Sequence, residues 1–192
     1  YTTGNTLSLH DALPILIALT GATQVEFHRG AASTLWGNEG MGGVINIRTN
    51  TFSGREDPGL ASLEGGSFST WNAGISQKFS HQSWKGNLAF TRKSTENNLP
   101  NHELDQWTGQ AYLEHQWNDQ WSGDLQLFSY HSEIGLPGNR KSPGYPQMQD
   151  FQRDQTGLIS PGFSFQPNEN HQFRGFYAYS ENDLRGLTSS AF

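Results

Sequence analysis

The histidines, serines and carboxylates of this chain do not show the spacings that catalysis requires. No G-x-S-x-G or H-E-x-x-H motif occurs, and the seven histidines include no pair four residues apart. His102 and Glu103 adjoin each other without a further metal ligand at a usual spacing. We therefore expect no catalytic residues, no metal site and no cofactor, and we do not expect an enzyme.

Two neighbouring cations, Arg140 and Lys141, stand close to Tyr145 in a stretch rich in proline and glycine. Such a stretch forms shaped turns rather than a helix. The two charges suit an anionic ligand, and a solvated loop tip is the alternative. The whole chain carries a net charge of −6, which argues against nucleic acid as a partner.

The densest run of small residues spans residues 25–49 and holds five glycines, at positions 30, 37, 40, 42 and 43. Glycine permits tight turns and close backbone approach, and Val44 to Arg48 alternates like a strand with one buried face. Gly40 and Gly42 begin a G-x-G-x-x-G pattern, but Ile45 stands where its last glycine belongs, so a phosphate loop is not expected. A glycine-rich hairpin of a soluble β-protein remains an alternative.

The elements that follow alternate with a period of two residues, which is typical of β-strands. Aromatic residues make up 12% of the chain, hydrophobic residues only 33%, and no run of about 18 apolar residues occurs. This composition favours an all-β fold. The seven expected strands are Leu60–Phe68, Thr70–Phe79, Trp84–Arg92, Trp107–Trp117, one from Trp121 to beyond Leu127, Arg153–Phe165, and one holding Phe173, Tyr177 and Tyr179.

The alternation divides the side chains of these strands between an apolar and a polar face. One set is expected on the convex, lipid-facing side: Trp71, Ile75, Trp84, Leu88, Phe90, Leu113, Trp117 and Leu125. The other is expected on the concave side: Lys78, Asn87, Arg92, Gln110 and Glu114.

Strand length and loop rhythm favour a membrane barrel over a soluble sandwich. Strands of about 10 residues tilted by ~45° climb roughly 23 Å, close to the ~25 Å apolar band of outer-membrane barrels, and aromatics stand at the strand ends. Short turns at 80–83, 118–120 and 166–170 alternate with long connections at 93–105 and 132–152. Periplasmic turns and extracellular loops alternate in this way.

The run 25–49 resembles the C-terminal end of the plug domain of TonB-dependent outer-membrane receptors, whose pattern includes E-x-x-R-G and G-G-V-I-N-I-x-T. Trp36 replaces the family's usual tyrosine, and Ala31 replaces its proline, which loosens that turn. The matching positions are Glu26, Arg29, Gly30, Ser33, Gly37, Gly42, Gly43, Val44, Ile45, Asn46, Ile47 and Thr49.

The resemblance implies a role as well as a fold. It implies a cell outer-membrane receptor that imports a scarce ligand, with TonB as the energising partner, lipid and lipopolysaccharide around the barrel, and no nucleic acid. A ferric siderophore is the first expectation for the ligand, followed by cobalamin, haem or an oligosaccharide. It also implies that Glu26 and Arg29 hold the plug to the barrel wall, so both are expected to point towards the sheet.

We therefore expect an all-β fragment: the plug tail with its linker at 21–57, then the first part of a transmembrane barrel at 58–192. Family barrels have about 22 strands, so about seven would form an open antiparallel meander. Residues 1–20 resemble a translated sequencing adaptor, and a divergent plug strand is the alternative. The rival for the whole chain is a soluble β-sandwich or lectin-like binding module.

Overall fold

The computed structural model describes residues 6–7, 24–30, 43–48, 59–136 and 150–187, and every regular element in these ranges is a β-strand. The chain divides into two compact units, residues 1–56 and 57–192. Within the described ranges, no helix is long and apolar enough to cross a membrane. The all-β prediction is confirmed.

The first unit contains a small antiparallel sheet with the order β1-β3-β2. Strand β2 (Gln24–Arg29) pairs along its whole length with β3 (Gly43–Arg48), and β1 (Thr6–Leu7) pairs with Asn46 and Ile45 on the other side of β3. The run that resembles a plug therefore begins and ends in strands, as its residue pattern predicts. Gly30 follows β2 with φ of 92°, a left-handed conformation that favours glycine.

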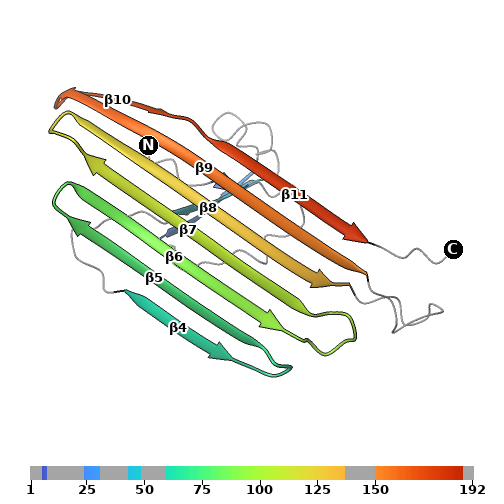
Figure 1. The fold of residues 1–192 in the computed structure, drawn as a ribbon. Coiled ribbons are helices and arrows are strands. Elements are labelled where there is room, and N and C mark those ends of the chain that lie inside the picture. The colour runs from blue at the N-terminus through green and yellow to red at the C-terminus, as the bar shows by residue number, and fades with distance from the viewer. Residues whose placement is uncertain (1–5, 8–23, 31–42, 49–58, 137–149, 188–192) are drawn as a thin grey trace. The chain divides into compact units, whose positions relative to one another are not determined.

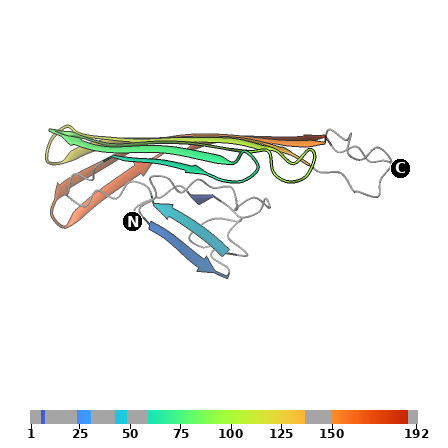
Figure 2. The same cartoon turned by 90° about the horizontal axis from the view of Figure 1, so that it is seen from below.

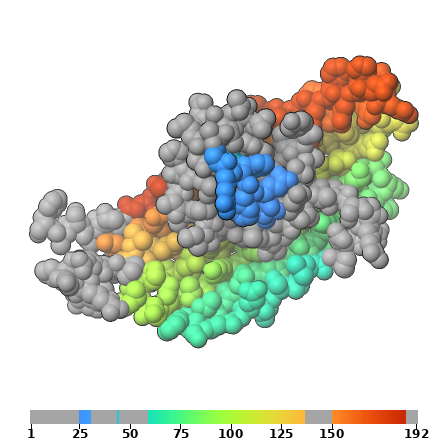
Figure 3. All heavy atoms as spheres, turned by 180° about the vertical axis from the view of Figure 1, so that it is seen from behind, coloured from blue at the N-terminus to red at the C-terminus, as the bar shows by residue number. Residues whose placement is uncertain are grey.

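The second unit is one antiparallel sheet in which consecutive strands are neighbours, from β4 at one end to β10 and β11 at the other (Figure 1). The space-filling view shows the same succession from teal to orange (Figure 3). This confirms the prediction of an antiparallel meander. The strands are β4 (Leu60–Gly65), β5 (Trp71–His81), β6 (Trp84–Thr95), β7 (Leu104–Gln116), β8 (Trp121–Gly135), β9 (Phe151–Asn168), β10 (His171–Phe176) and β11 (Tyr179–Leu187).

The last two strands, β10 and β11, share one position beside β9. Their registers with β9 are continuous, since Phe176 is opposite Gly162 and Tyr179 is opposite Ile159. Between these pairs, Pro161 accepts a hydrogen bond from the Tyr177 amide at 3.0 Å but has no amide hydrogen to return. The missing ladder bond explains why the single expected strand is interrupted there.

Several strand ends differ from the predictions. The first strand ends at Gly65 rather than Phe68, because residues 66–70 form a turn in which Phe68 and Ser69 take positive φ. The long connections are shorter than expected, since β6 and β7 extend to Thr95 and Leu104 and β8 and β9 extend to Gly135 and Phe151. Polar side chains at these ends had indicated loops.

Seen from below, strands β4 to β8 lie in a single layer, and β10 bends out of it with the adjoining end of β9 (Figure 2). No pairing joins β4 to β10 or β11 within the described residues, so the sheet is open. An open sheet of these strands matches the expected meander rather than a closed ring.

Candidate membrane interface

The strand register sorts the side chains of the second unit onto two faces, because cross-strand partners share a face. Ile75 is opposite Phe90, Leu88 is opposite Ala111, and Leu113 is opposite Leu125. Continued across the sheet, these pairs define what we call the apolar face. All eight side chains expected on the lipid-facing side belong to it, with Trp117 placed there by its approach to Gly123.

The apolar face is exposed rather than packed. Ile75, Leu88 and Phe163 are 58%, 48% and 51% exposed, although they lie in the middle of long strands. A contiguous exposed apolar surface of this kind marks an interaction with another protein or a membrane. In a soluble sandwich these side chains would be buried against a second sheet.

A row of aromatic side chains lies at the short-turn end of the apolar face. Trp84 packs on His115 with ring centroids 4.3 Å apart, and Trp121 stacks on Phe165 at the same separation. Trp117 approaches His115 edge-on, with ring centroids 5.7 Å apart. We call these five side chains the inner aromatic row.

A second aromatic row lies towards the long loops and consists of Trp71, Trp107 and Tyr179. Trp107 stacks on His131 with centroids 5.8 Å apart, and the guanidinium of Arg92 lies 5.7 Å from the centre of the Trp71 ring. Trp107 on β7 and Trp117, the residue that follows this strand, are ten positions apart. At ~3.3 Å per residue and a tilt of about 40°, this spacing corresponds to about 25 Å, the height of a barrel's apolar band.

Ion pairs lie at and beyond the outer row on the same face. Arg92 pairs with Asp105 at 3.0 Å, Arg153 with Glu133 at 2.7 Å, and Arg185 with Asp183 at 2.7 Å. The expectation that Arg92 faces the concave side is therefore wrong. Its even position on β6 places it with Leu88 and Phe90, as the two-residue period requires.

The three short turns are staggered in a regular way. The cross-strand register allows the height of each turn to be expressed in the numbering of β8. On this scale the turn at Gln82 and Ser83 is level with residues 121–122, and the next turn is centred on Asp119. The turn at Glu169 and Asn170 is level with residues 116–117. Each pair of strands thus shifts the turn by about 2.5 residues. A shift of about 2.5 residues is ~8 Å along the strands, and two strands span ~10 Å across the sheet, so the strands are tilted by about 40°. Barrel strands tilt by about 35–45°.

The opposite side of the sheet, which we call the polar face, holds the charged and amide side chains. Gln110 is opposite Ala89 there, and Lys85 is 3.3 Å from Glu114, which also accepts a hydrogen bond from the Tyr112 hydroxyl at 2.8 Å. Lys78, Asn87, Gln110 and Glu114 lie on this face as expected.

A further ion pair on the polar face spans three strands. Arg174 on β10 reaches over β9 to Asp124 on β8, with Nη2 and Oδ1 3.3 Å apart. The side chain of Asp124 is only 9% exposed. The reach is possible because Gly162 lies between them, where a Cβ atom would stand 2.8 Å from Asp124 Oδ1.

Asn101 joins the two long connections at their bases. Its side-chain amide donates to the carbonyls of Leu136 and Asp150 at 2.8 and 2.7 Å, and these two residues are themselves bonded at 2.8 Å. Gly135 donates to the Glu103 carbonyl at 2.8 Å. The connection after β6 is thus fastened to both strands that flank residues 136–150.

In the first unit, Glu26 lies 3.7 Å from His28 on the same face of β2. Arg29 is three residues further along the strand, so its side chain belongs to the opposite face. The two side chains therefore lie on opposite faces of β2, and their contact with the barrel wall stays a prediction. Gly30 follows β2 in a bend with positive φ, and Gly43 is the first residue of strand β3, opposite Arg29, whereas Gly37, Gly42, Arg140, Lys141 and Tyr145 lie outside the described residues.

Sequence reasoning missed Asn101, the Arg174–Asp124 pair and the ion pairs beside the outer aromatic row. Only Arg92 had a usable signal, since it shares its parity with Leu88 and Phe90. Arg185 and Asp183 are two positions apart on β11, whereas the contacts of Asn101 with Asp150, of Arg153 with Glu133 and of Arg174 with Asp124 join residues 20 to 50 positions apart and depend on the strand register. No protein-family model matches this chain, and no curated protein matches it.

Proposed function

We propose that this chain is part of a TonB-dependent outer-membrane receptor, comprising the tail of the plug and the first strands of the barrel. The stagger of the three short turns is the observation that carries the proposal. Closing a sheet into a barrel requires tilted strands and a constant shift of register between neighbours. A shift of about 2.5 residues per hairpin is what a tilt of about 40° demands.

The distribution of polarity supports the same conclusion. No Asp, Glu, Lys or Arg lies between the inner and outer aromatic rows on the described part of the apolar face. Charges gather instead on the polar face and beyond the outer row. A membrane barrel has this arrangement, with lipid outside and water inside.

The role of the whole receptor follows from the resemblance of residues 25–49 to a plug. The receptor would import a scarce ligand, with a ferric siderophore first and cobalamin, haem or an oligosaccharide behind it. The cations Arg140 and Lys141, with Tyr145, would meet this ligand or lipopolysaccharide phosphate in an extracellular loop. Glu26 and Arg29 would each find a partner on the barrel wall, because an unpaired charge enclosed there costs several kcal/mol.

The substitution Leu88→Arg tests the membrane assignment against the soluble alternative. Leu88 lies midway between the aromatic rows, where an arginine facing lipid costs about 2–4 kcal/mol. The chain is folded into phosphatidylcholine vesicles and its membrane-bound fraction is measured by flotation. We expect Leu88→Arg to lower partitioning by a factor of about 30 to 900.

The matched control is Gln110→Arg, on the neighbouring strand but on the polar face. We expect it to float like the unsubstituted chain, since the added charge would face water. A soluble sandwich or lectin-like module would behave differently. It would stay in solution as a monomer without lipid, and Leu88→Arg at a half-exposed site would change its stability by no more than about 0.5 kcal/mol.

A further inference from the structure

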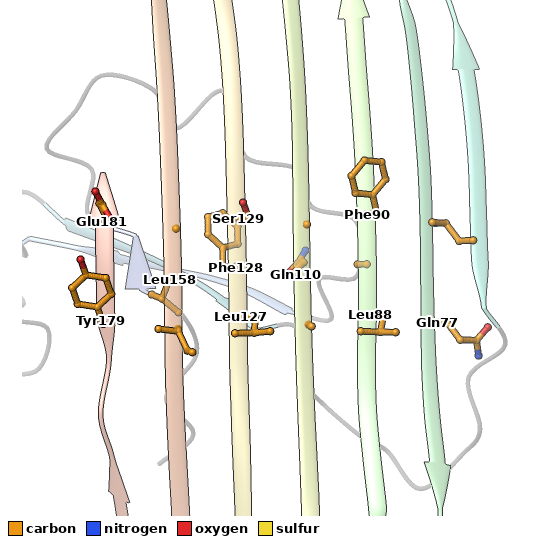
Figure 4. A pocket seen from close by; sticks show the side chains of 16 residues that line it. Gln77, Leu88, Phe90, Gln110, Leu127, Phe128, Ser129, Leu158, Tyr179 and Glu181 are labelled. Atoms are coloured by element: carbon orange, nitrogen blue, oxygen red, sulfur yellow. The ribbon is translucent and has the colours of Figure 1, made fainter. Parts of the chain in front are cut away.

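The apolar face is hollowed across β7, β8 and β9. The hollow has a volume of about 800 Å3, with Leu88 on one side and Tyr179 on the other (Figure 4). Its floor exists because Gly109, Ser129 and Gly157 are cross-strand partners, so three adjacent strands carry almost no side chain at one level. A lipid acyl chain fits such a floor, because its methylene groups can approach the backbone directly.

The membrane normal crosses this hollow obliquely, because the strands are tilted by about 40°. A line that passes one strand across for every two residues towards the long loops moves ~4.8 Å across and ~6.6 Å along, a slope of about 36°. Through the register, such a line starts on β6 and meets one residue on each following strand. These residues are Leu88, Gly109, His131 and Arg153, and we call them the diagonal. They follow one another in the order in which a lipid along the membrane normal would meet them.

The diagonal is apolar at its lower end and polar at its upper end. Leu88 lies midway between the aromatic rows, and the hollow opens above it at Gly109. His131 stacks on Trp107 with ring centroids 5.8 Å apart and lies 3.0 Å from the Gln155 side-chain nitrogen. These residues all lie on β6 to β9, which have a paired neighbour on both sides. A further barrel strand beside β10 and β11 would therefore leave them in place.

A second hollow, of about 400 Å3, lies at the upper end of the diagonal. Trp107, His131 and Gln155 line it from β7 to β9, and Glu181 and Asp183 line it from β11. Among the described residues no Lys or Arg lines it, so it suits hydroxyl groups rather than a phosphate. A sugar ring has C–H groups on its faces and hydroxyls at its edge, so it can pack on an aromatic ring beside hydrogen-bonding side chains.

Arg153 completes the diagonal with a guanidinium that has donors to spare. Its Nε and Nη2 atoms donate to one oxygen of Glu133, at 3.0 and 2.7 Å. Three of its five N–H groups therefore remain, and its side chain is 40% exposed. Arginine binds phosphate through such N–H groups in charge-assisted hydrogen bonds.

We propose that the diagonal binds the lipid A end of a lipopolysaccharide, which is an acylated and phosphorylated sugar. One acyl chain lies on the floor at Gly109, a sugar ring packs on Trp107, and a phosphate accepts hydrogen bonds from Arg153. Lipopolysaccharide is the lipid expected at this end of the sheet, because the long loops of a barrel are extracellular. This inference rests on the proposed function, since it requires the apolar face to contact the outer leaflet.

Native mass spectrometry of the full chain in detergent micelles tests the proposal with three lipids. They are lipid A, lipid A stripped of its phosphates, and phosphatidylglycerol, which has a phosphate but no sugar ring. We expect lipid A to half-saturate the chain at an about tenfold lower mole fraction than either of the others. The stripped lipid loses the bonds to Arg153, and phosphatidylglycerol loses the packing on Trp107.

Two pairs of variants separate phosphate recognition from chain recognition. Arg153→Gln should weaken lipid A binding to the level of the stripped lipid, whose own binding should not change. Arg92→Gln removes another ion-paired arginine of the same face, away from the diagonal, and should keep the tenfold difference. Gly109→Leu should fill the floor and weaken binding of all three lipids several-fold. The control Gly65→Leu has open space at its Cβ and lies on the same face at β4, so it should leave binding unchanged.

The outcomes distinguish this proposal from the proposed function. If the chain floats with vesicles but binds the three lipids equally, the lipid A site is overturned and the membrane assignment stands. A lipid A preference that survives Arg153→Gln, or that Arg92→Gln lowers equally, also overturns the site. If the chain does not float with vesicles at all, both proposals are overturned.

Discussion

The substitution Gly162→Ala should break the Arg174–Asp124 ion pair without touching either partner. A methyl group at position 162 would lie 2.8 and 2.9 Å from the two carboxylate oxygens of Asp124. Carbon and oxygen cannot approach this closely, and the short Asp124 side chain has little freedom to retreat. The carboxylate must therefore move away from Arg174, which lies 3.3 Å from it.

The cost follows from the burial of the pair. Asp124 is nearly buried and Arg174 about a quarter exposed, so the pair lies between a surface pair, worth ~0–1 kcal/mol, and a buried one, whose disruption costs ~3–5 kcal/mol. We expect Gly162→Ala to lower the free energy of unfolding by about 1–2 kcal/mol. Urea unfolding of the full chain in detergent micelles, followed by circular dichroism, measures this difference.

The matched control is Gly157→Ala on the same strand, where the added methyl meets nothing within 4 Å. Gly157→Ala should raise the free energy of unfolding by up to about 1 kcal/mol, because alanine restricts the conformations of the unfolded chain. When Arg174→Ala is already present, adding Gly162→Ala should lower the free energy of unfolding clearly less, since the ion pair is already gone. An undiminished cost in that background would refute the assigned mechanism, and so would equal effects of the two glycine substitutions.

Three further predictions concern other parts of the chain. Asn101→Asp keeps a residue that tolerates the positive φ of 54°, but it removes the two hydrogen bonds that the Asn101 amide donates to Leu136 and Asp150. Hydrogen exchange of the Leu136 amide should therefore accelerate at least about tenfold. The control Asn98→Asp, at an exposed site, should leave this exchange rate unchanged. Trp107→Ala should lower flotation with vesicles several-fold by removing an outer-row aromatic, and flotation equal to that of the unsubstituted chain would contradict the role of that row. Arg29→Glu in the full-length receptor should loosen the plug and admit large antibiotics across the outer membrane. Wild-type permeability and ligand uptake would show that Arg29 does not hold the plug.

The faces of the sheet were predictable because each strand repeats with a period of two. Once Ile75 and Phe90 are assigned to strands, the faces of their neighbours follow without knowledge of the register. The strand ends were not predictable by the same rule. Glu133 fell within the expected loop at 132–152, yet it pairs with Arg153 across β8 and β9 at 2.7 Å within extended strands.

Contacts that depend on the register lay beyond the sequence. Arg174 and Asp124 are 50 residues apart and meet only because β9 brings Gly162 between them. Asn101 likewise bonds Asp150 only when β7, β8 and β9 are in their observed alignment. In the plug-like run the motif was visible in the sequence, but the motif alone did not show how its side chains are oriented. The two-residue period of the strand places Glu26 and Arg29 on different faces of β2.

The tilt derived from the turns has a second, independent support in the outer aromatic row. Through the register, Trp71 is level with Ser94 of β6, Trp107 with Arg92, and Tyr179 with Leu88. In a sheet with upright strands these three rings would be spread over six residues, or about 20 Å of height. With each strand shifted by about 1.25 residues, as the turns require, they fall at one height. Turn positions and aromatic positions are set by different residues, and a soluble sheet gives no reason for them to follow the same slope. A flat bilayer surface does give one, because it requires every strand to present its aromatic ring at the same depth.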